Sequence, residues 1–203
     1  MKQALFSIIE VFPGLLTAVL LTACGSTISA PPVSHGVPFP ANYKIDFVRY
    51  ATVDHKDAVV RDLYISPTAL EQVRAGYALP EGTIIVVEGY EAKRDADGQP
   101  MRDASGRFIK GEMKPEIHIA EKRSTWQAED FESGQLSDDW NFGSYVASGE
   151  HFDEPLTPCF NCHNTTERSD FIWSLPMLWR YQRSGGQVQY EYCNASGRSP
   201  CDL

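Results

Sequence analysis

The stretch Ile84-Ile85-Val86-Val87-Glu88-Gly89-Tyr90 holds the strongest strand signal in this 203-residue chain. Its β-branched residues and its terminal tyrosine are typical of a packed strand. The turn-forming sequence Pro80-Glu81-Gly82-Thr83 precedes it directly. We therefore predict a strand over residues 84–90 that leaves a tight turn and enters a packed sheet.

Further strands are expected on both sides of this stretch. Residues 50–65 combine a polar opening with an apolar run and suit a strand pair or an extended segment, and residues 115–122 and 140–146 suit two more strands. Residues 66–76 begin with a serine cap and a proline and end at a glycine, which predicts a short helix. Since no long helical periodicity occurs, we predict a mainly β (α+β) fold, an antiparallel β-sheet domain with a few short helices.

The composition restricts the classes of function. The chain has 27 acidic and 18 basic residues, a net charge of -9, and 42% hydrophobic and 11% aromatic residues. Its length suits one domain with some extra segments, and its aromatic content argues against disorder. The acidic excess opposes binding to a phosphate backbone, so nucleic acid is not expected as a partner.

Two turn sequences, at residues 95–98 and 103–106, interrupt the region between the predicted strands. The first is superficially similar to a calcium-binding loop, but it lacks the third acidic ligand, the glycine of the sixth position and the final glutamate. We therefore interpret both sequences as solvated turns in a long hairpin connection.

The N-terminus carries an export signature. The apolar run over residues 15–23 is too short for a permanent membrane span but suits a signal peptide. It ends in Leu21-Thr22-Ala23-Cys24-Gly25, which resembles a bacterial lipobox cleaved before Cys24. We predict a lipoprotein signal peptide over residues 1–23, lipid attachment at Cys24, and a periplasmic protein anchored to a bacterial membrane, most simply the outer one. An ordinary secretory signal is the alternative.

Two further segments flank the expected domain. Residues 24–42 are rich in Pro and Ser and predict an extended tether, which leaves the folded domain to residues 43–183. Residues 184–203 form a tail in which Cys193 and Cys201 enclose seven residues rich in turn formers. In an oxidising compartment such cysteines most simply form a disulfide, and two free thiols are the alternative.

The sequence Cys159-Phe160-Asn161-Cys162-His163 is the motif that carries chemistry. Its cysteines can form thioethers to the vinyl groups of haem, and its histidine can bind the iron. A zinc site would need four ligands, and a redox CxxC would need a βαβ surround. The remaining histidines, none of them at a paired spacing, are His35, His55, His118 and His151. We therefore predict one covalent haem c, attached through Cys159 and Cys162 with His163 as axial ligand.

Met177 is the sole methionine after this motif, and it stands between Pro176 and Leu178-Trp179. These neighbours favour a packing role over iron ligation. The other axial face of the haem is then open or weakly filled, which favours ligand chemistry. A six-coordinate electron-transfer cytochrome c tethered to a membrane is the alternative, and a haem-free structural lipoprotein is a third hypothesis.

A late CxxCH motif after a β-rich region resembles the cytochrome P-460 family over residues 45–175. The other elements that carry the resemblance are residues 60–67, 80–83 and 119–123, Asp139-Trp140 and Asp170-Phe171. The resemblance implies a small, mostly antiparallel β domain with one covalent haem, His163 as proximal ligand and an open distal site. Family members oxidise hydroxylamine and nitric oxide, or bind nitric oxide.

By position within the resemblance, Arg61 corresponds to an arginine near the haem, and Glu121 corresponds to a distal carboxylate. We predict both as catalytic residues, since oxidation of hydroxylamine releases protons that must leave the pocket. The alternatives are a surface charge for Arg61 and, for Glu121, a partner of Lys122 or Arg123 on a solvated face.

One position departs from the family's pattern. Hydroxylamine-oxidising members carry a lysine bonded to the haem edge, where the alignment places Val87; Lys93 lies six residues on, and Lys122 lies on another strand. Enzymatic activity is therefore left open, and we expect a protein that binds or oxidises nitric oxide or hydroxylamine. The expected partners are that ligand, a soluble redox protein and a second copy in a homodimer, with membrane contact only through the lipid.

Overall fold

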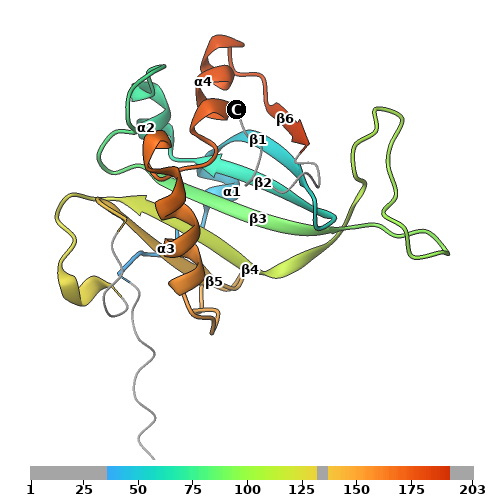
Figure 1. The fold of residues 1–203 in the computed structure, drawn as a ribbon, viewed down its shortest axis with the longest axis horizontal. Helices are drawn as coiled ribbons and strands as arrows, with labels where there is room; N and C mark the ends of the chain where they lie inside the picture. The colour runs from blue at the N-terminus through green and yellow to red at the C-terminus, as the bar shows by residue number, and fades with distance from the viewer. Residues whose placement is uncertain (1–35, 132–136, 193–203) are drawn as a thin grey trace, which may run out of the picture. The chain divides into compact units, whose positions relative to one another are not determined.

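A mixed β-sheet organises the computed structural model, which describes residues 36–131 and 137–192 of the unit Pro32–Leu203. Within these residues the sheet has six strands in the order β5-β4-β3-β2-β1-β6 (Figure 1). The strands are β1 Val48–His55, β2 Val59–Ile65, β3 Ile84–Ala92, β4 Lys110–Lys122, β5 Trp140–Tyr145 and β6 Gln189–Tyr192. The helices are α1 Tyr43–Asp46, α2 Pro67–Gln72, α3 Thr157–His163 and α4 Leu175–Arg183, with the 3-10 helices η1 Ala128–Asp130 and η2 Asn164–Ser169.

The strands from β1 to β5 pair antiparallel with their neighbours, which confirms the predicted mainly β (α+β) fold. β3 begins at Ile84 as predicted, directly after a turn in which the amide of Thr83 donates to the carbonyl of Pro80 at 3.2 Å. The predicted helix over 66–76 is shorter, because Val73 already has an extended backbone with ψ 129°.

One strand was not expected. β6 lies in the segment assigned to a C-terminal tail, and it pairs parallel with β1, so the sheet is not purely antiparallel. Its four residues follow two glycines and form an edge strand, and so short an alternating stretch predicts a strand only weakly. The predicted tail of residues 184–203 therefore contains an edge strand at Gln189–Tyr192.

The two faces of the sheet carry separate cores, because successive side chains of a strand point to opposite sides. One face bears Leu63, Ile85, Ala120 and Phe142, which pack with residues of α3 and α4. We name it the motif face, and Figure 1 shows α3 crossing it in front of β4 and β5. The opposite face, named the α1 face, bears a smaller cluster that includes Tyr43 of α1. Alternation assigns the face of the other strand residues, except near the register shifts at Arg49–Ala51 of β1 and at Glu88–Ala92, where β3 pairs with β4.

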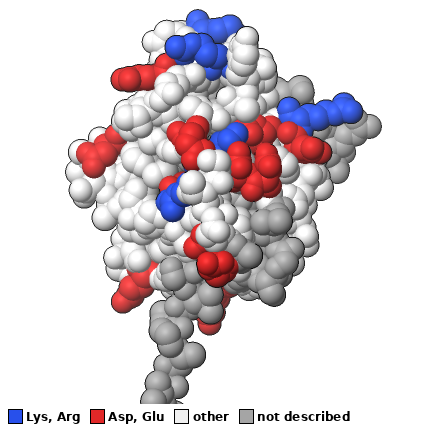
Figure 2. Space-filling view, turned by 90° about the vertical axis from the view of Figure 1, so that its left-hand side faces the viewer, with Lys and Arg blue, Asp and Glu red and all other residues white. Residues whose placement is uncertain are grey.

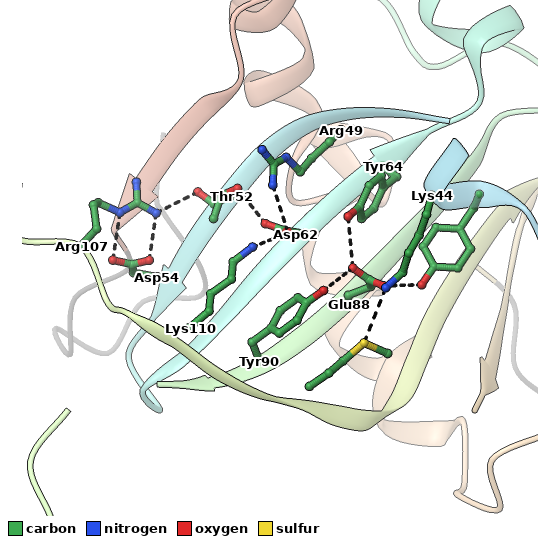
Figure 3. Close-up of polar contacts among 12 residues, drawn as sticks. Lys44, Arg49, Thr52, Asp54, Asp62, Tyr64, Glu88, Tyr90, Arg107 and Lys110 are labelled. Carbon is green, nitrogen blue, oxygen red and sulfur yellow. Dashed lines mark hydrogen bonds and ion pairs between the residues drawn. The ribbon is translucent and has the colours of Figure 1, made fainter. Parts of the chain in front are cut away.

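A buried carboxylate ties α1 to the α1 face (Figure 3). Glu88 of β3 accepts hydrogen bonds from the hydroxyls of Tyr43, Tyr64 and Tyr90, the last two at 3.1 and 2.8 Å. The ammonium of Lys44 lies 2.6 Å from the same carboxylate. Burial acts to raise the pKa of Glu88, but the hydrogen bonds from Lys44, Tyr43 and Tyr90 outweigh it, so the pKa lies below its usual value. Glu88 is therefore ionised at neutral pH.

The predicted turns between β3 and β4 form a ribbon that extends from the sheet (Figure 1). Asp95 accepts the amides of Asp97 and Gln99 at 2.9 Å each, so its carboxylate is used within the turn, as the interpretation of a solvated turn predicted. Arg107 anchors the ribbon to β1 through Asp54, with nitrogen–oxygen distances of 3.0 and 2.9 Å (Figure 3).

The surface has an uneven charge distribution. Figure 2 shows the side of the molecule on which α2 and residues 123–131 lie, and acidic side chains gather there around a few basic ones. Across the described ranges, no helix combines the length and the apolar character that a membrane crossing requires.

Candidate functional site

α3 presents the CxxCH motif on one side of a short helix. Cys159, Cys162 and His163 are spaced i, i+3 and i+4, a spacing that places side chains on one helical face. Phe160 points to the core instead, is 1% exposed, and packs edge-on against Phe142 of β5 with ring centroids 4.9 Å apart. This contact holds α3 on the motif face, with the thiol of Cys159 half-buried and that of Cys162 exposed.

The ring of His163 is fixed from two sides. It lies against Phe142 with the ring centroids 4.4 Å apart, and its Nδ1 lies 2.5 Å from the carbonyl oxygen of Phe171. Because a carbonyl can only accept, Nδ1 carries the proton and Nε2 is the nitrogen with a free lone pair. Burial lowers the pKa of His163, which favours the neutral imidazole that binds metals.

The strand register places Arg61 on the motif face. Arg61 of β2 pairs with Gly89 of β3, and Leu63, two residues on, belongs to the core beneath α3 and α4. Its guanidinium lies 3.0 Å from the carboxylate of Asp57. Its Nη1 is buried and has no hydrogen-bond partner among the residues that the structure describes. Arg61 is therefore a half-buried cation on the motif face, not a freely solvated charge.

The same register places Glu121 on the α1 face, which corrects the prediction that it lies in a haem pocket. It pairs with Ile84 and Asn141, whereas its neighbour Ala120 packs with the core of the motif face. Its Oε1 accepts from Arg123 at 2.5 Å, the pairing given above as the alternative, although Glu121 is only 6% exposed. A side chain one residue out of phase on a strand cannot reach the other face.

The carboxylate of β4 on the motif face is Glu116, which sequence reasoning missed. It lies four residues before Ala120 and pairs with Lys114 at 2.8 Å, and Lys114 lies beside Gly89, the partner of Arg61 on β2. The register of β4 on β3 shifts between Ile117 and Met113, so these contacts, not the register, place Glu116 on this face. Burial, the largest single influence, acts to raise the pKa of Glu116, but the hydrogen bond and charge of Lys114, the backbone amide of Glu116 and the charge of His118 together outweigh it, so the pKa is lowered. His118 lies between Glu116 and Ala120 on the same strand, and its Nε2 is 2.9 Å from the carboxylate of Glu154. The alternation with Ile117 and Ile119 was the signal that could have identified this polar row.

Neither of the two lysines discussed with Val87, Lys93 and Lys122, lies next to Val87 in the structure. Lys93 is exposed at the start of the ribbon, and Lys122 binds Asp170 at 2.7 Å. Lys114 lies beside Gly89, two residues after Val87 on the motif face, since a Cβ added to Gly89 would lie 3.1 Å from its Cδ. The glycine therefore leaves room for this side chain to cross the strand.

Comparison of the sequence with models of known families identifies the family of this chain. The sequence model of cytochrome P460 matches residues 40–174, a range that includes both Arg61 and the motif of α3. This chain belongs to the cytochrome P460 family. A search of curated proteins found no significant match. Membership of the cytochrome P460 family implies a covalently bound haem and a c-type cytochrome that acts on nitrogen compounds at a general level.

The residues of this cytochrome P460 protein fit such a group. The motif places two thiols and the lone pair of a neutral imidazole on one side of α3, which is the donor set of a c-type haem. On the same face of the sheet, Arg61 Nη1 and Ser144 Oγ are buried without a partner among the described residues. Two such atoms on the face that bears the motif are consistent with a haem held there by Cys159, Cys162 and His163. By contrast, the described ranges hold no group of three or more His, Cys, Asp and Glu arranged for a bare metal ion.

Two other sets of predictions for this cytochrome P460 protein concern Met177 and the cysteines outside the motif. Met177 of α4 is 3% exposed and lies in the core of the motif face, where it packs as predicted. Cys24, Cys193 and Cys201 lie outside the described residues, so lipid attachment and the disulfide stay predictions.

Proposed function

We propose that this cytochrome P460 protein carries one haem c on α3 and uses an open distal face to bind or oxidise nitric oxide or hydroxylamine. Cys159 and Cys162 hold the haem through thioethers, and His163 binds the iron through Nε2. The observation that supports this most is the arrangement on the motif face, where Arg61 pairs with Gly89, and Lys114, the ion-pair partner of Glu116, lies beside Gly89.

The chain's own groups suit a small, polar nitrogen ligand. When bound, haem supplies an iron site and a one-electron couple. The guanidinium of Arg61 can donate hydrogen bonds to a nitrogen or oxygen atom of the ligand. The carboxylate of Glu116 is held ionised by Lys114, so it can accept hydrogen bonds, and then protons, from the N–H or O–H groups of hydroxylamine. Together they orient a ligand that has both donors and acceptors.

The location and the partners are proposed on the sequence features. An export signal with a lipobox-like end supports a periplasmic protein anchored through Cys24. A soluble redox protein of the same compartment would then exchange electrons with it. The homodimer remains part of the proposal as an expectation from the sequence.

A titration with nitric oxide and a turnover assay test the proposal together. We expect the ferrous holoprotein to bind nitric oxide stoichiometrically with a large change in its visible spectrum. Oxidation of hydroxylamine with an artificial electron acceptor then separates an oxidase from a binding protein. If the iron takes up no nitric oxide and turns over no hydroxylamine, the proposal fails and the electron-transfer alternative replaces it.

A further inference from the structure

The backbone beside the axial histidine adopts an unfavourable conformation at two consecutive residues. Asp170 follows the last residue of η2 and has φ 52° and ψ 42°, and the next residue, Phe171, has φ 58°. The left-handed region is unfavourable for residues other than glycine, and least so for Asn and Asp, and for a bulky residue such as Phe171 it is a real outlier. Such conformations persist only where the surroundings hold them, and they often occur at functional sites.

A buried ion pair holds this segment in place. Lys122 of β4 donates to both carboxylate oxygens of Asp170, at 2.7 and 2.9 Å, and each side chain is 10% exposed. The amide of Leu79 donates to the same carboxylate at 2.7 Å. The backbone of Lys122 is itself fixed, since its amide donates to the carbonyl of Thr83 at 2.9 Å. The carboxylate of Asp170 is thus bound to β4 and to the loop after α2 at once.

The conformation held in this way orients His163. Phe171 donates its amide to the carbonyl of Thr166 at 3.2 Å and turns its own carbonyl to Nδ1 of His163 at 2.5 Å. The acceptor behind a metal-binding histidine fixes the ring and sets the basicity of the ligand. Here that acceptor is a neutral carbonyl, while the nearby carboxylate is one residue away and engaged by Lys122.

We infer that Lys122 and Asp170 are positioning residues for the axial histidine, because their ion pair holds the left-handed turn that presents the carbonyl of Phe171 to Nδ1 of His163. In this role they act on the iron through His163. The inference rests on His163 being the ligand proposed above.

Resonance Raman spectroscopy of the ferrous holoprotein tests this inference through the iron–histidine stretching band. In Lys122→Met and Asp170→Ala we expect the band to shift to lower frequency and the midpoint potential to rise, since a weaker hydrogen bond makes His163 a less basic ligand. Lys122→Arg, which can still bind both oxygens of Asp170, should keep the band near its wild-type position.

Arg107→Met is the matched control, because it breaks a comparable ion pair, with Asp54, on the α1 face. It should lower thermal stability yet leave the band and the potential unchanged. If Lys122→Met lowers stability but leaves the band in place, or shifts it upward, the inference is overturned. His163→Met should remove the iron–histidine band of the wild-type protein. If the wild type lacks this band, or His163→Met retains it, the proposed ligand is wrong and this inference falls with it.

Discussion

At the scale of single residues, the position of a carboxylate on β4 decides which face of the sheet it serves. Glu116 lies on the motif face through its ion pair with Lys114, and Glu121 is out of phase with Ala120 of that face. Both are largely buried and both pair with a cation from their own strand or its continuation. They therefore form a matched pair for separating a functional carboxylate from a structural one.

We expect Glu116→Gln to reduce hydroxylamine turnover about 10- to 1,000-fold, or, in a protein that only binds nitric oxide, to change the dissociation rate of that ligand. Glu121→Gln should leave both quantities within a factor of about two, although it can lower stability by about 1–3 kcal/mol through Arg123. Steady-state and stopped-flow measurements on the two variants check this. A larger functional loss in Glu121→Gln than in Glu116→Gln would return Glu121 to the haem pocket.

At the scale of elements, α1 is a helix of one turn that depends on the buried carboxylate of β3. Glu88 is fully buried and binds two residues of α1, Tyr43 and Lys44. Removing its charge leaves these donors without a strong acceptor. We expect Glu88→Gln to lower the free energy of unfolding at pH 7 by about 2–4 kcal/mol in urea unfolding. Glu91→Gln, an exposed carboxylate on the same strand, should change it by less than about 0.5 kcal/mol.

The same carboxylate predicts a pH dependence. The pKa of Glu88 is lower in the folded protein than its usual value of 4.5, so its charge stabilises the fold above that pH. As the pH falls below 4.5 and through the folded pKa, protonation removes this stabilisation. The stability of the wild-type protein should therefore decrease more steeply with acid below that pH than the stability of Glu88→Gln. Parallel acid dependences of the two proteins would contradict this role.

The elements also show what the sequence could and could not predict. The strand over residues 84–90 and the turns of the ribbon follow from local chemistry, and the strand was predicted to within two residues. β6 was missed because its partner β1 lies far away in sequence. Glu121 was misplaced because a family correspondence does not fix the phase of a strand, whereas alternation with Ile117 and Ile119 does.

At the scale of the whole molecule, the net charge of -9 bears on the proposed exchange of electrons with a partner. Acidic side chains gather on the face that Figure 2 shows, so a cationic partner is attracted and an anionic one is repelled. We expect the electron-transfer rate to a cationic inorganic acceptor to fall as salt rises, and the rate to an anionic acceptor to increase, since the Debye length is about 10 Å at 0.1 M. Equal salt dependences for both acceptors would show that this charge does not steer the exchange.

The fold as a whole brings distant segments to one face: Arg61 from β2, Glu116 from β4, and the motif from α3 after β5. The most direct test of the proposed open distal face is the absorption spectrum of the ferrous protein without added ligand. We predict a covalently held, five-coordinate, high-spin haem whose spectrum changes on adding nitric oxide. A low-spin haem in both oxidation states, with a methionine–iron charge-transfer band in the ferric form and no response to nitric oxide, would contradict the account.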